Sequence, residues 1–368
     1  MRKIALFGFI IILNLTGFAQ TINSVEKDML QKKPKNIIFF IGDGMGFNHV
    51  LATSYYQFGE DGKQVYQGNE WVKLSQSTYP AVLKNNSDPK VYAAGYNPQK
   101  AWSDSEYAKK DYTDSGAGGT ALSTGRKTYN GSIGMGVFGD TLYNVAESAK
   151  AIGKAIGVVS SVPLSHATPA SFIAHNEYRN NYAQIAQYMI FSSKTDVIMA
   201  PGNPDYDDNA MPSKGDSQSV GGIEVWNWLK AGGAQTELVL DGKKLKVKDI
   251  DGDGNPDPWV LVQDSIEFVK LMNGPTPKRV IGVPKVYSTL QQGRNVIEGS
   301  VMPFETPFNR EVPSLEQMSM AAINVLSKNE SGFFLMIEGG AIDWASHSNQ
   351  SDRLIEEQIA FNKAIESA

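Results

Sequence analysis

The sequence predicts a three-layer α/β/α sandwich with a mostly parallel central sheet that carries insertions. A length of 368 residues, of which 41% are hydrophobic and 20% charged, suits one large globular domain. Four apolar runs are rich in β-branched or aromatic residues: NIIFFIGDGMG, AIGVVSSVPLSHATPA, DVIMAPGNP and GFFLMIEGGAID. Continuous apolar runs of this length are typical of strands buried on both faces, as in a parallel sheet covered by helices.

Residues 1–19 are typical of a secretory signal peptide. Two basic residues precede an apolar stretch over 4–15, and Gly-Phe-Ala at 17–19 has the small-x-small pattern of a cleavage site. A membrane anchor is the alternative, but the run is shorter than the ~20 apolar residues that a span requires. We therefore expect residues 20–368 to be periplasmic or secreted, with no membrane anchor after cleavage.

Charge and cysteine content restrict the classes of partner. The formal net charge of -5 and the absence of a Lys/Arg run argue against a general nucleic-acid binder. The chain contains no cysteine and four histidines. It therefore has no disulfide, and a transition metal would have to bind through histidine and carboxylate side chains.

The helix that precedes the last strand has a recognisable start. In PSLEQMSMAAINVLSKN, Ser314 and Gln317 form a capping box after Pro313. Two other regions fit the sheet poorly: residues 55–110 are polar and aromatic, and residues 202–313 are rich in Gly, Pro and Asp. We expect both regions to be insertions.

Residues that could take part in catalysis or metal binding follow two of the apolar runs. These positions correspond to the carboxyl ends of the strands, where ligands bind in a parallel sheet. Asp43 lies between two glycines after IIFFIG, although such a sequence on its own commonly forms only a turn. Glu338, Asp343 and His347 follow FFLMI, and the last two are four residues apart on one helical face. Such a pair can bind a divalent ion, with Glu338 reaching a second; the alternative is a surface Asp-His pair.

Residues 111–128 have the sequence DYTDSGAGGTALSTGRKT, and most of their side chains are too small and too polar for an ordinary core helix. Ser115 would stand at the start of a Gly- and Ala-rich helix, where free backbone N–H groups favour an anion such as phosphate. The alternative is a helix N-cap serine. A P-loop is excluded, because the spacing does not fit G-x-x-x-x-G-K-[ST].

Four motifs together resemble the alkaline phosphatase family: IGDGMG, TDSGAGGTALSTGRKTYNGSIG, HATPASFIAHNEYR and EGGAIDWASH. The resemblance covers residues 35–368. It implies that Ser115 is the nucleophile that becomes a phosphoserine, and that Arg179 binds phosphate, positioned by Asp114. A guanidinium group can contact two phosphate oxygens at once, which a lysine cannot reproduce.

The resemblance also implies three metal sites. Asp43 would bridge one zinc and the magnesium, Thr168 and Glu338 would bind the magnesium, and Asp343 and His347 would bind the other zinc. The ions would activate the serine hydroxyl and stabilise the leaving oxygen.

His166 occupies a place near the magnesium that varies within the family. There it would act through water or through the local charge. The implied function is hydrolysis of small phosphate monoesters by a homodimer that holds two zinc ions and one magnesium. The alternatives are a related metal-dependent phosphodiesterase or sulfatase, and a non-catalytic fragment that binds metal or phosphate.

One departure concerns the end of the sequence. In the family, a further strand supplies an Asp-His pair and a later histidine supplies another zinc ligand, whereas this sequence ends in DRLIEEQIAFNKAIESA. The domain over 20–368 is therefore expected to be incomplete at its C-terminus. The final segment is predicted to be an amphipathic helix with Leu354, Ile355, Ile359 and Ile365 on its apolar face.

A separate motif, DIDGDGNPDPW, partly fits a calcium loop. Asp249, Asp251, Asp253 and Asp257 occupy positions 1, 3, 5 and 9 of that pattern. Position 12 is Val260 and lacks the bidentate carboxylate. Ca²⁺ binding and a cluster of Asp-Gly turns are the two interpretations.

Overall fold

The computed structural model describes residues 34–83, 92–94, 97–110, 112–232 and 235–368. The chain forms two units, residues 1–37 and 38–368, and only positions 34–37 of the first unit are described. The predicted signal peptide over 1–19 lies outside the described residues. Within the described ranges, no helix is long and apolar enough to cross a membrane.

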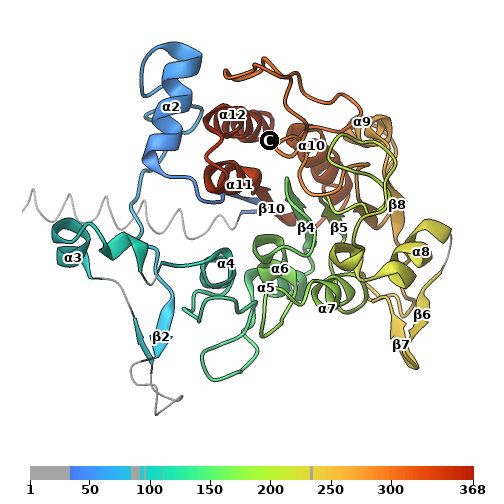
Figure 1. The fold of residues 1–368 in the computed structure, drawn as a ribbon. Helices are drawn as coiled ribbons and strands as arrows, with labels where there is room; N and C mark the ends of the chain where they lie inside the picture. Colours follow the sequence, from blue (N-terminus) through green and yellow to red (C-terminus); the bar gives the residue numbers. More distant parts are fainter. Residues whose placement is uncertain (1–33, 84–91, 95–96, 111, 233–234) are drawn as a thin grey trace, which may run out of the picture. The chain divides into compact units, whose positions relative to one another are not determined.

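A six-stranded sheet forms the centre of residues 38–368 (Figure 1). Its strand order is β1-β10-β4-β5-β9-β8, and neighbouring strands from β10 to β8 pair in parallel. The strands are β1 (Ile37–Gly42), β4 (Ala155–Ser160), β5 (Val197–Met199), β8 (Val260–Val262), β9 (Val280–Gly282) and β10 (Phe333–Gly339). Every residue of β4, β5, β9 and β10 is buried, as predicted for strands covered on both faces.

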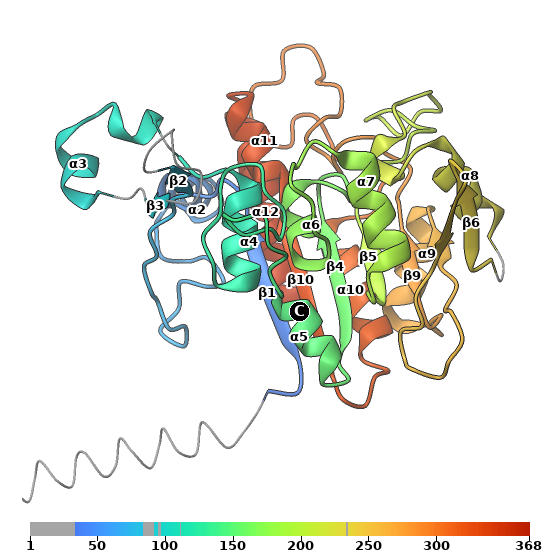
Figure 2. The same cartoon turned by 90° about the horizontal axis from the view of Figure 1, so that it is seen from below.

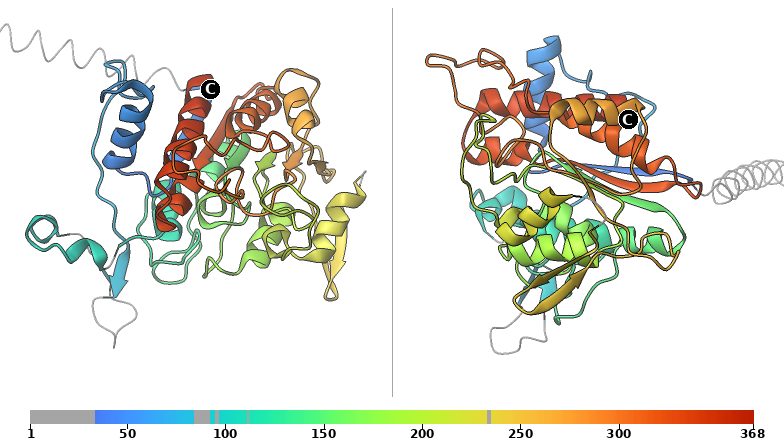
Figure 3. Two further views of the ribbon diagram at one scale, coloured as in Figure 1. Left: turned by 45° about the horizontal axis from the view of Figure 1, so that its top comes forward. Right: turned by 90° about the vertical axis from the view of Figure 1, so that its right-hand side faces the viewer.

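Helices cover both faces of this sheet, which is seen nearly edge-on in the right-hand view of Figure 3. One layer contains α2 (Phe47–Phe58), α9 (Ser265–Asn273), α10 (Leu315–Leu326), α11 (Ala341–His347) and α12 (Ser351–Ser367). The other contains α4 (Ser115–Thr124), α5 (Val145–Ala151), α6 (Ala167–Ile173) and α7 (Tyr182–Gln187). The predicted three-layer α/β/α architecture is therefore confirmed.

The interpretation of residues 202–313 as an insertion is partly wrong. This region supplies β8 and β9 to the main sheet, together with α8 (Ile223–Ala231) and a hairpin of β6 (Glu237–Leu240) and β7 (Lys243–Lys246). β8 and β9 have three residues each, so their apolar runs are too short to stand out among the surrounding Gly, Pro and Asp.

The described residues of the region 55–110 lie outside the main sheet, as expected for an insertion. They include a two-stranded antiparallel ladder of β2 (Ala81–Leu83) and β3 (Tyr92–Ala94), followed by α3 (Pro98–Ser103). The predicted capping box of α10 is also present: Gln317 N donates to Ser314 Oγ at 3.1 Å, and Ser314 N donates to Gln317 Oε1 at 2.9 Å.

α12 buries a more polar face than its sequence predicts. Of the predicted apolar residues, Ile359 is buried, whereas Leu354, Ile355 and Ile365 are only half-buried. The helix instead buries Glu356, which accepts from Arg294 Nη2 at 2.8 Å and from Arg353 Nη1 at 3.1 Å. These charges can be buried because each has an opposite partner.

Candidate active site

The carboxyl ends of the central strands lead into a cavity of about 840 Å³. Figure 2 shows α11 beyond one end of β10 and α5 toward the opposite end of the sheet. Eight of the nine predicted site residues line the cavity: Asp43, Asp114, Ser115, His166, Thr168, Arg179, Asp343 and His347. The ninth, Glu338, is fully buried in β10. The structure therefore brings together residues from the four motifs.

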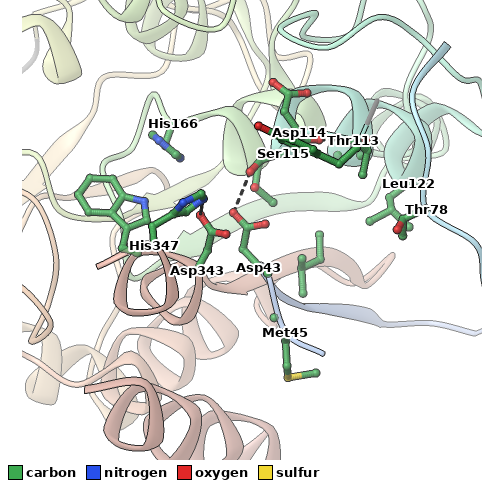
Figure 4. Close-up of a pocket in the computed structure, with 18 of the residues that line it drawn as sticks. Asp43, Met45, Thr78, Thr113, Asp114, Ser115, Leu122, His166, Asp343 and His347 are labelled. Atoms are coloured by element: carbon green, nitrogen blue, oxygen red, sulfur yellow. Dashed lines mark hydrogen bonds and ion pairs between the residues drawn. The ribbon is translucent and has the colours of Figure 1, made fainter. Parts of the chain in front are cut away.

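Ser115 is the first residue of α4, but it does not cap that helix. The N-cap is Asp114, whose Oδ1 accepts a hydrogen bond from Ala117 N at 2.8 Å. The N-cap interpretation of Ser115 is therefore wrong. Its hydroxyl is free to point into the cavity, where it donates to Asp43 Oδ2 at 2.9 Å, and Figure 4 shows the two side chains facing each other.

Arg179 is held through its side chain by Asp114 and through its backbone by Gly131. Its Nη1 donates to Asp114 Oδ2 at 3.0 Å, and the same oxygen accepts from Gly131 N at 2.9 Å. Gly131 O in turn accepts from Arg179 N at 2.7 Å. Both charged side chains are 19% exposed, so the guanidinium group faces the cavity in a fixed orientation.

His166 lies beside this arginine and is neutral. Burial and then the charge of Arg179 lower the pKa of the imidazole to about 3. Its Nε2 is 3.4 Å from Arg179 Nη2, and its ring packs edge-on against Trp344 with 5.5 Å between centroids. A neutral ring here adds no positive charge to the cavity.

A second group of polar atoms lies below the cavity floor. Glu338 Oε2 accepts from Ser160 Oγ at 2.5 Å, whereas Glu338 Oε1 and Thr168 Oγ1 are buried without a hydrogen-bond partner. Burial, and next the charge of Asp43, raises the pKa of Glu338. Burial, and next the charge of Asp343, raises the pKa of Asp43. Burial and mutual repulsion therefore outweigh the attraction that Arg179 exerts on Asp43, and the negative charge of these carboxylates is not fully compensated.

Asp343 and His347 lie one turn apart on α11, as predicted. His347 Nε2 is 3.5 Å from Asp343 Oδ2, and the exposed fractions of the two side chains are 79% and 24%. Gly44 packs against Asp343 with a φ of +62°, and a Cβ atom at that position would lie 2.6 Å from Asp343 Oδ1. Only glycine fits both the left-handed backbone and the close approach.

The Asp-Gly loop over 249–257 is a separate feature. Oxygens of Asp249, Asp251 and Asp257 lie within 4.8 Å of one another. Lys278 Nζ lies 2.5 Å from Asp251 Oδ2 and 2.5 Å from Asp257 Oδ1. Asp249 accepts the backbone N–H groups of the turn itself. These contacts favour the turn interpretation over a calcium loop, because an ammonium group already neutralises the carboxylates.

Two positions in and below the cavity were not identified from the sequence. Ser160 ends β4 and donates to Glu338, and it could have been found with the same strand-end rule that identified Asp43. Tyr112 lines the cavity from the segment before Ser115 and is 66% exposed. No sequence signal separates its role from that of any surface tyrosine.

Comparison with known proteins gives a consistent result. The sequence model of the family described as alkaline phosphatase matches residues 34–368. The chain is 31% identical over 361 residues to alkaline phosphatase of Escherichia coli, covering 93% of this chain and 68% of that protein. It is 28% identical over 345 residues to alkaline phosphatase 3 of Bacillus subtilis, covering 92% of this chain and 58% of that protein.

Solved structures share the fold. The alkaline phosphatase from the Antarctic bacterium TAB5 aligns with a TM-score of 0.56 at 24% identity, over 91% of this chain and 74% of that one. The enzyme from Thermus thermophilus aligns with a TM-score of 0.58 at 23% identity, over 92% and 56%. From the match of the family model over 34–368 and the identity to the Escherichia coli protein, this chain belongs to the alkaline phosphatase family.

Proposed function

We propose that this chain is an alkaline phosphatase that hydrolyses phosphate monoesters through a phosphoserine at Ser115. The observation that carries the proposal is the shared position of three groups in one cavity. The Ser115 hydroxyl contacts Asp43, and the Arg179 guanidinium group lies next to them, held by Asp114. A nucleophile beside an arginine fork is the arrangement that phosphoryl transfer requires.

The donor set fits the metal ions of the family. Asp43, Glu338 and Asp343 are crowded acidic groups with raised pKa values, and oxygens of Glu338 and Thr168 have no partner. We propose that Thr168, Glu338 and Asp43 would hold Mg²⁺, because hard cations take oxygen ligands. A TAB5 alkaline phosphatase variant is described with Mg bound in its M3 site, which supports magnesium as one of the metals.

Asp343 and His347 would hold one Zn²⁺, and Asp43 with Ser115 would contribute to a second. His166 would influence the Mg²⁺ site through water or through its neutral ring. When bound, the ions would supply positive charge that lowers the pKa of the serine hydroxyl and of a water molecule.

In the first half of the reaction, Ser115 Oγ forms a bond to phosphorus and the bond from phosphorus to the ester oxygen breaks. The hydroxyl proton is released to solvent water, and Asp43 Oδ2, which accepts the hydrogen bond of the hydroxyl group, orients Ser115 for the attack. The leaving oxygen keeps the electron pair and takes a proton from water. In the second half, a water molecule releases a proton to solvent and its oxygen attacks phosphorus, the bond to Ser115 Oγ breaks, Ser115 Oγ takes up a proton from water, and phosphate is released.

Arg179 would bind two non-bridging phosphate oxygens in both halves of the reaction. Asp114 and Gly131 fix the guanidinium plane, so little orientation is lost when phosphate binds. Because these contacts are made to the phosphoryl group alone, the leaving group is only weakly selected. We therefore propose a broad range of monoester substrates.

The decisive experiment is phosphoryl trapping. The chain, supplied with Zn²⁺ and Mg²⁺, is incubated with radiolabelled phosphate, quenched in acid and analysed for labelled serine. Label is expected in the unaltered chain and not in Ser115→Ala, with the fold of the variant unchanged by circular dichroism. Label that persists in Ser115→Ala would refute the assignment of the nucleophile.

Arg179→Ala and alternative substrates test the rest of the site. The variant is expected to weaken inhibition by inorganic phosphate about hundredfold, since two charge-assisted hydrogen bonds are lost. Turnover of an aryl phosphate, a diester and a sulfate ester distinguishes a monoesterase from a phosphodiesterase or a sulfatase. Phosphate binding without turnover of any ester would indicate a non-catalytic binding protein.

We also propose export to the periplasm or the medium and assembly as a homodimer. Export is supported by the basic and apolar pattern over 1–19. Mass spectrometry of the mature N-terminus checks cleavage after Ala19, and light scattering checks the dimer. A mature protein that begins at Met1, or a monomer at micromolar concentration, would contradict the respective proposal.

A further inference from the structure

His175 lies on the segment that leads from α6 to Arg179, and both of its ring nitrogens face acceptors. Nδ1 is 3.0 Å from Gly134 O, and Nε2 is 3.1 Å from Glu147 Oε1. The side chain is only 7% exposed. A carbonyl and a carboxylate oxygen can only accept, so both contacts are hydrogen bonds when both ring nitrogens carry protons. The geometry therefore selects the imidazolium form.

The backbone that His175 contacts is paired with the segment that carries Arg179. Residues 131–134 form a strip that runs antiparallel to residues 176–179: Ile133 N and Asn176 O, and Asn176 N and Ile133 O, are paired at 2.9 and 2.8 Å. At the end of the strip, Gly131 O accepts from Arg179 N and Gly131 N donates to Asp114. The strip thus supports the backbone of Arg179 and the carboxylate that orients its side chain.

The contact between the strip and His175 leaves no free space. Gly134 has a φ of +60°, and a Cβ atom there would lie 2.5 Å from His175 Nδ1. On its other side, Gly134 N donates to Thr120 Oγ1 of α4 at 2.9 Å, and Thr120 Oγ1 donates to Ser132 O at 3.1 Å. The strip is therefore held between α4 and the imidazole ring.

We propose that His175, as an imidazolium, is a positioning residue that fastens the strip over 131–134 to Glu147 of α5 and so holds Arg179 in its phosphate-binding orientation. The inference rests on the proposed role of Arg179. His175 itself contacts neither the cavity nor any proposed metal ligand, so its effect on phosphate is transmitted through the backbone of the strip.

The charged and titratable groups around His175 determine how this support depends on pH. Glu147 faces it from α5, the Tyr188 ring packs edge-on at 5.6 Å from η2 (Tyr188–Ser192), and Glu177 lines the same surface pocket. Burial lowers the pKa of His175, but the hydrogen bonds to Glu147 and Gly134 outweigh burial and raise it above 6.5.

The direction of the pH dependence follows from the raised pKa of His175. The support is fully present below pH 6.5, the ordinary value, and is lost as the pH rises through the higher pKa of folded His175. Glu147 is 36% exposed, so solvent screens the ion pair and the effect is moderate. Phosphate binding is expected to weaken on the alkaline side because Arg179 is less well positioned.

The test combines calorimetry and NMR on the intact chain. Inorganic phosphate is titrated between pH 6 and 9 into the unaltered chain, His175→Gln and Glu147→Gln, and ¹⁵N-histidine spectra report the protonation of His175. His175→Gln is expected to bind phosphate about tenfold more weakly at pH 6.5, because one charge-assisted hydrogen bond is lost. Ionisation of phosphate itself is common to all variants and cancels in the ratio.

Glu147→Gln keeps an acceptor for Nε2 but removes the charge. At pH 6 it is expected to bind phosphate as the unaltered chain does. As the pH rises, its affinity is expected to fall at a lower pH than in the unaltered chain, and the NMR transition of His175 should move by the same amount. This variant carries the test if His175→Gln does not fold.

Different results overturn different statements. A neutral His175 at pH 6, or equal phosphate affinity in the unaltered chain and His175→Gln at every pH, would overturn the positioning role and leave the proposed function intact. No phosphate binding by the unaltered chain, or equal phosphate affinity in the unaltered chain and Arg179→Ala, would overturn the proposed phosphate site and with it the role of His175.

Discussion

Two adjacent glycines of α4 provide a matched test of how closely this helix approaches α6. A Cβ atom at Gly119 would lie 2.3 Å from Ser171 Oγ and 3.2 Å from Ser171 Cβ. Ser171 is buried and its hydroxyl donates to Thr168 O at 2.8 Å, so it cannot move without disturbing α6. Gly119→Ala therefore overpacks the contact, at a cost of about 1–3 kcal/mol.

The change from glycine to alanine also favours the helix by about 1 kcal/mol. The net loss of unfolding free energy in Gly119→Ala is therefore expected to be between about zero and 2 kcal/mol. Gly118→Ala is the control, because a Cβ atom there would lie 3.8 Å from Thr113 Oγ1 and meets no closer atom. It gains the same propensity without the clash, so it is expected to stabilise the chain by about 1 kcal/mol.

Urea unfolding at constant pH measures both variants, and the difference between them isolates the steric cost of about 1–3 kcal/mol. Ser171→Ala in the Gly119→Ala background removes the nearest atom and is expected to recover part of the loss. Equal stability of the two glycine variants would refute the close approach of α4 and α6.

Three further outcomes are expected. Gly44→Ala should destabilise the chain by about 1–2 kcal/mol in urea, because it forces a left-handed alanine against Asp343; unchanged stability would contradict this. Burial raises the pKa of Glu357 from 4.5 to about 7, so the free energy of unfolding should fall as the pH rises through this range. Glu357→Gln should make this pH dependence smaller. Calorimetry with Ca²⁺ should give no heat at the 249–257 loop, because Lys278 neutralises Asp251; heat abolished by Asp251→Asn would argue otherwise.

The architecture was predictable where an apolar run is followed by small or turn-forming residues and then by chemically distinctive ones. The runs that became β1, β4, β5 and β10 stand out for this reason. β8 and β9 are as short as β5, but they lie in a region rich in Gly, Pro and Asp, and only the pairing of Val260 with Val280 in the folded chain gives them a place in the sheet.

The site was predictable to the level of residue type and motif. The spacing of Asp343 and His347 is a local property of one helix, so it could be inferred directly. The contact between Ser115 and Asp43 joins segments 72 residues apart and depends on tertiary packing. The double hydrogen bond of His175 could not be inferred either, because neither Gly134 nor Glu147 is marked by the sequence as its partner.

The order of strands has a consequence for how the chain folds. β10, the last strand of the sheet in sequence, lies between β1 and β4, so the first strand has no neighbour in the described sheet until Phe333–Gly339 has been synthesised. Pairing over such a separation is slow, because a long loop must close before any contact is gained. The contact of Asp43 N with Gly339 O depends on the same event. During synthesis, the chain should therefore remain without an assembled catalytic centre, exposed to chaperones and proteases, until almost its whole described length is available.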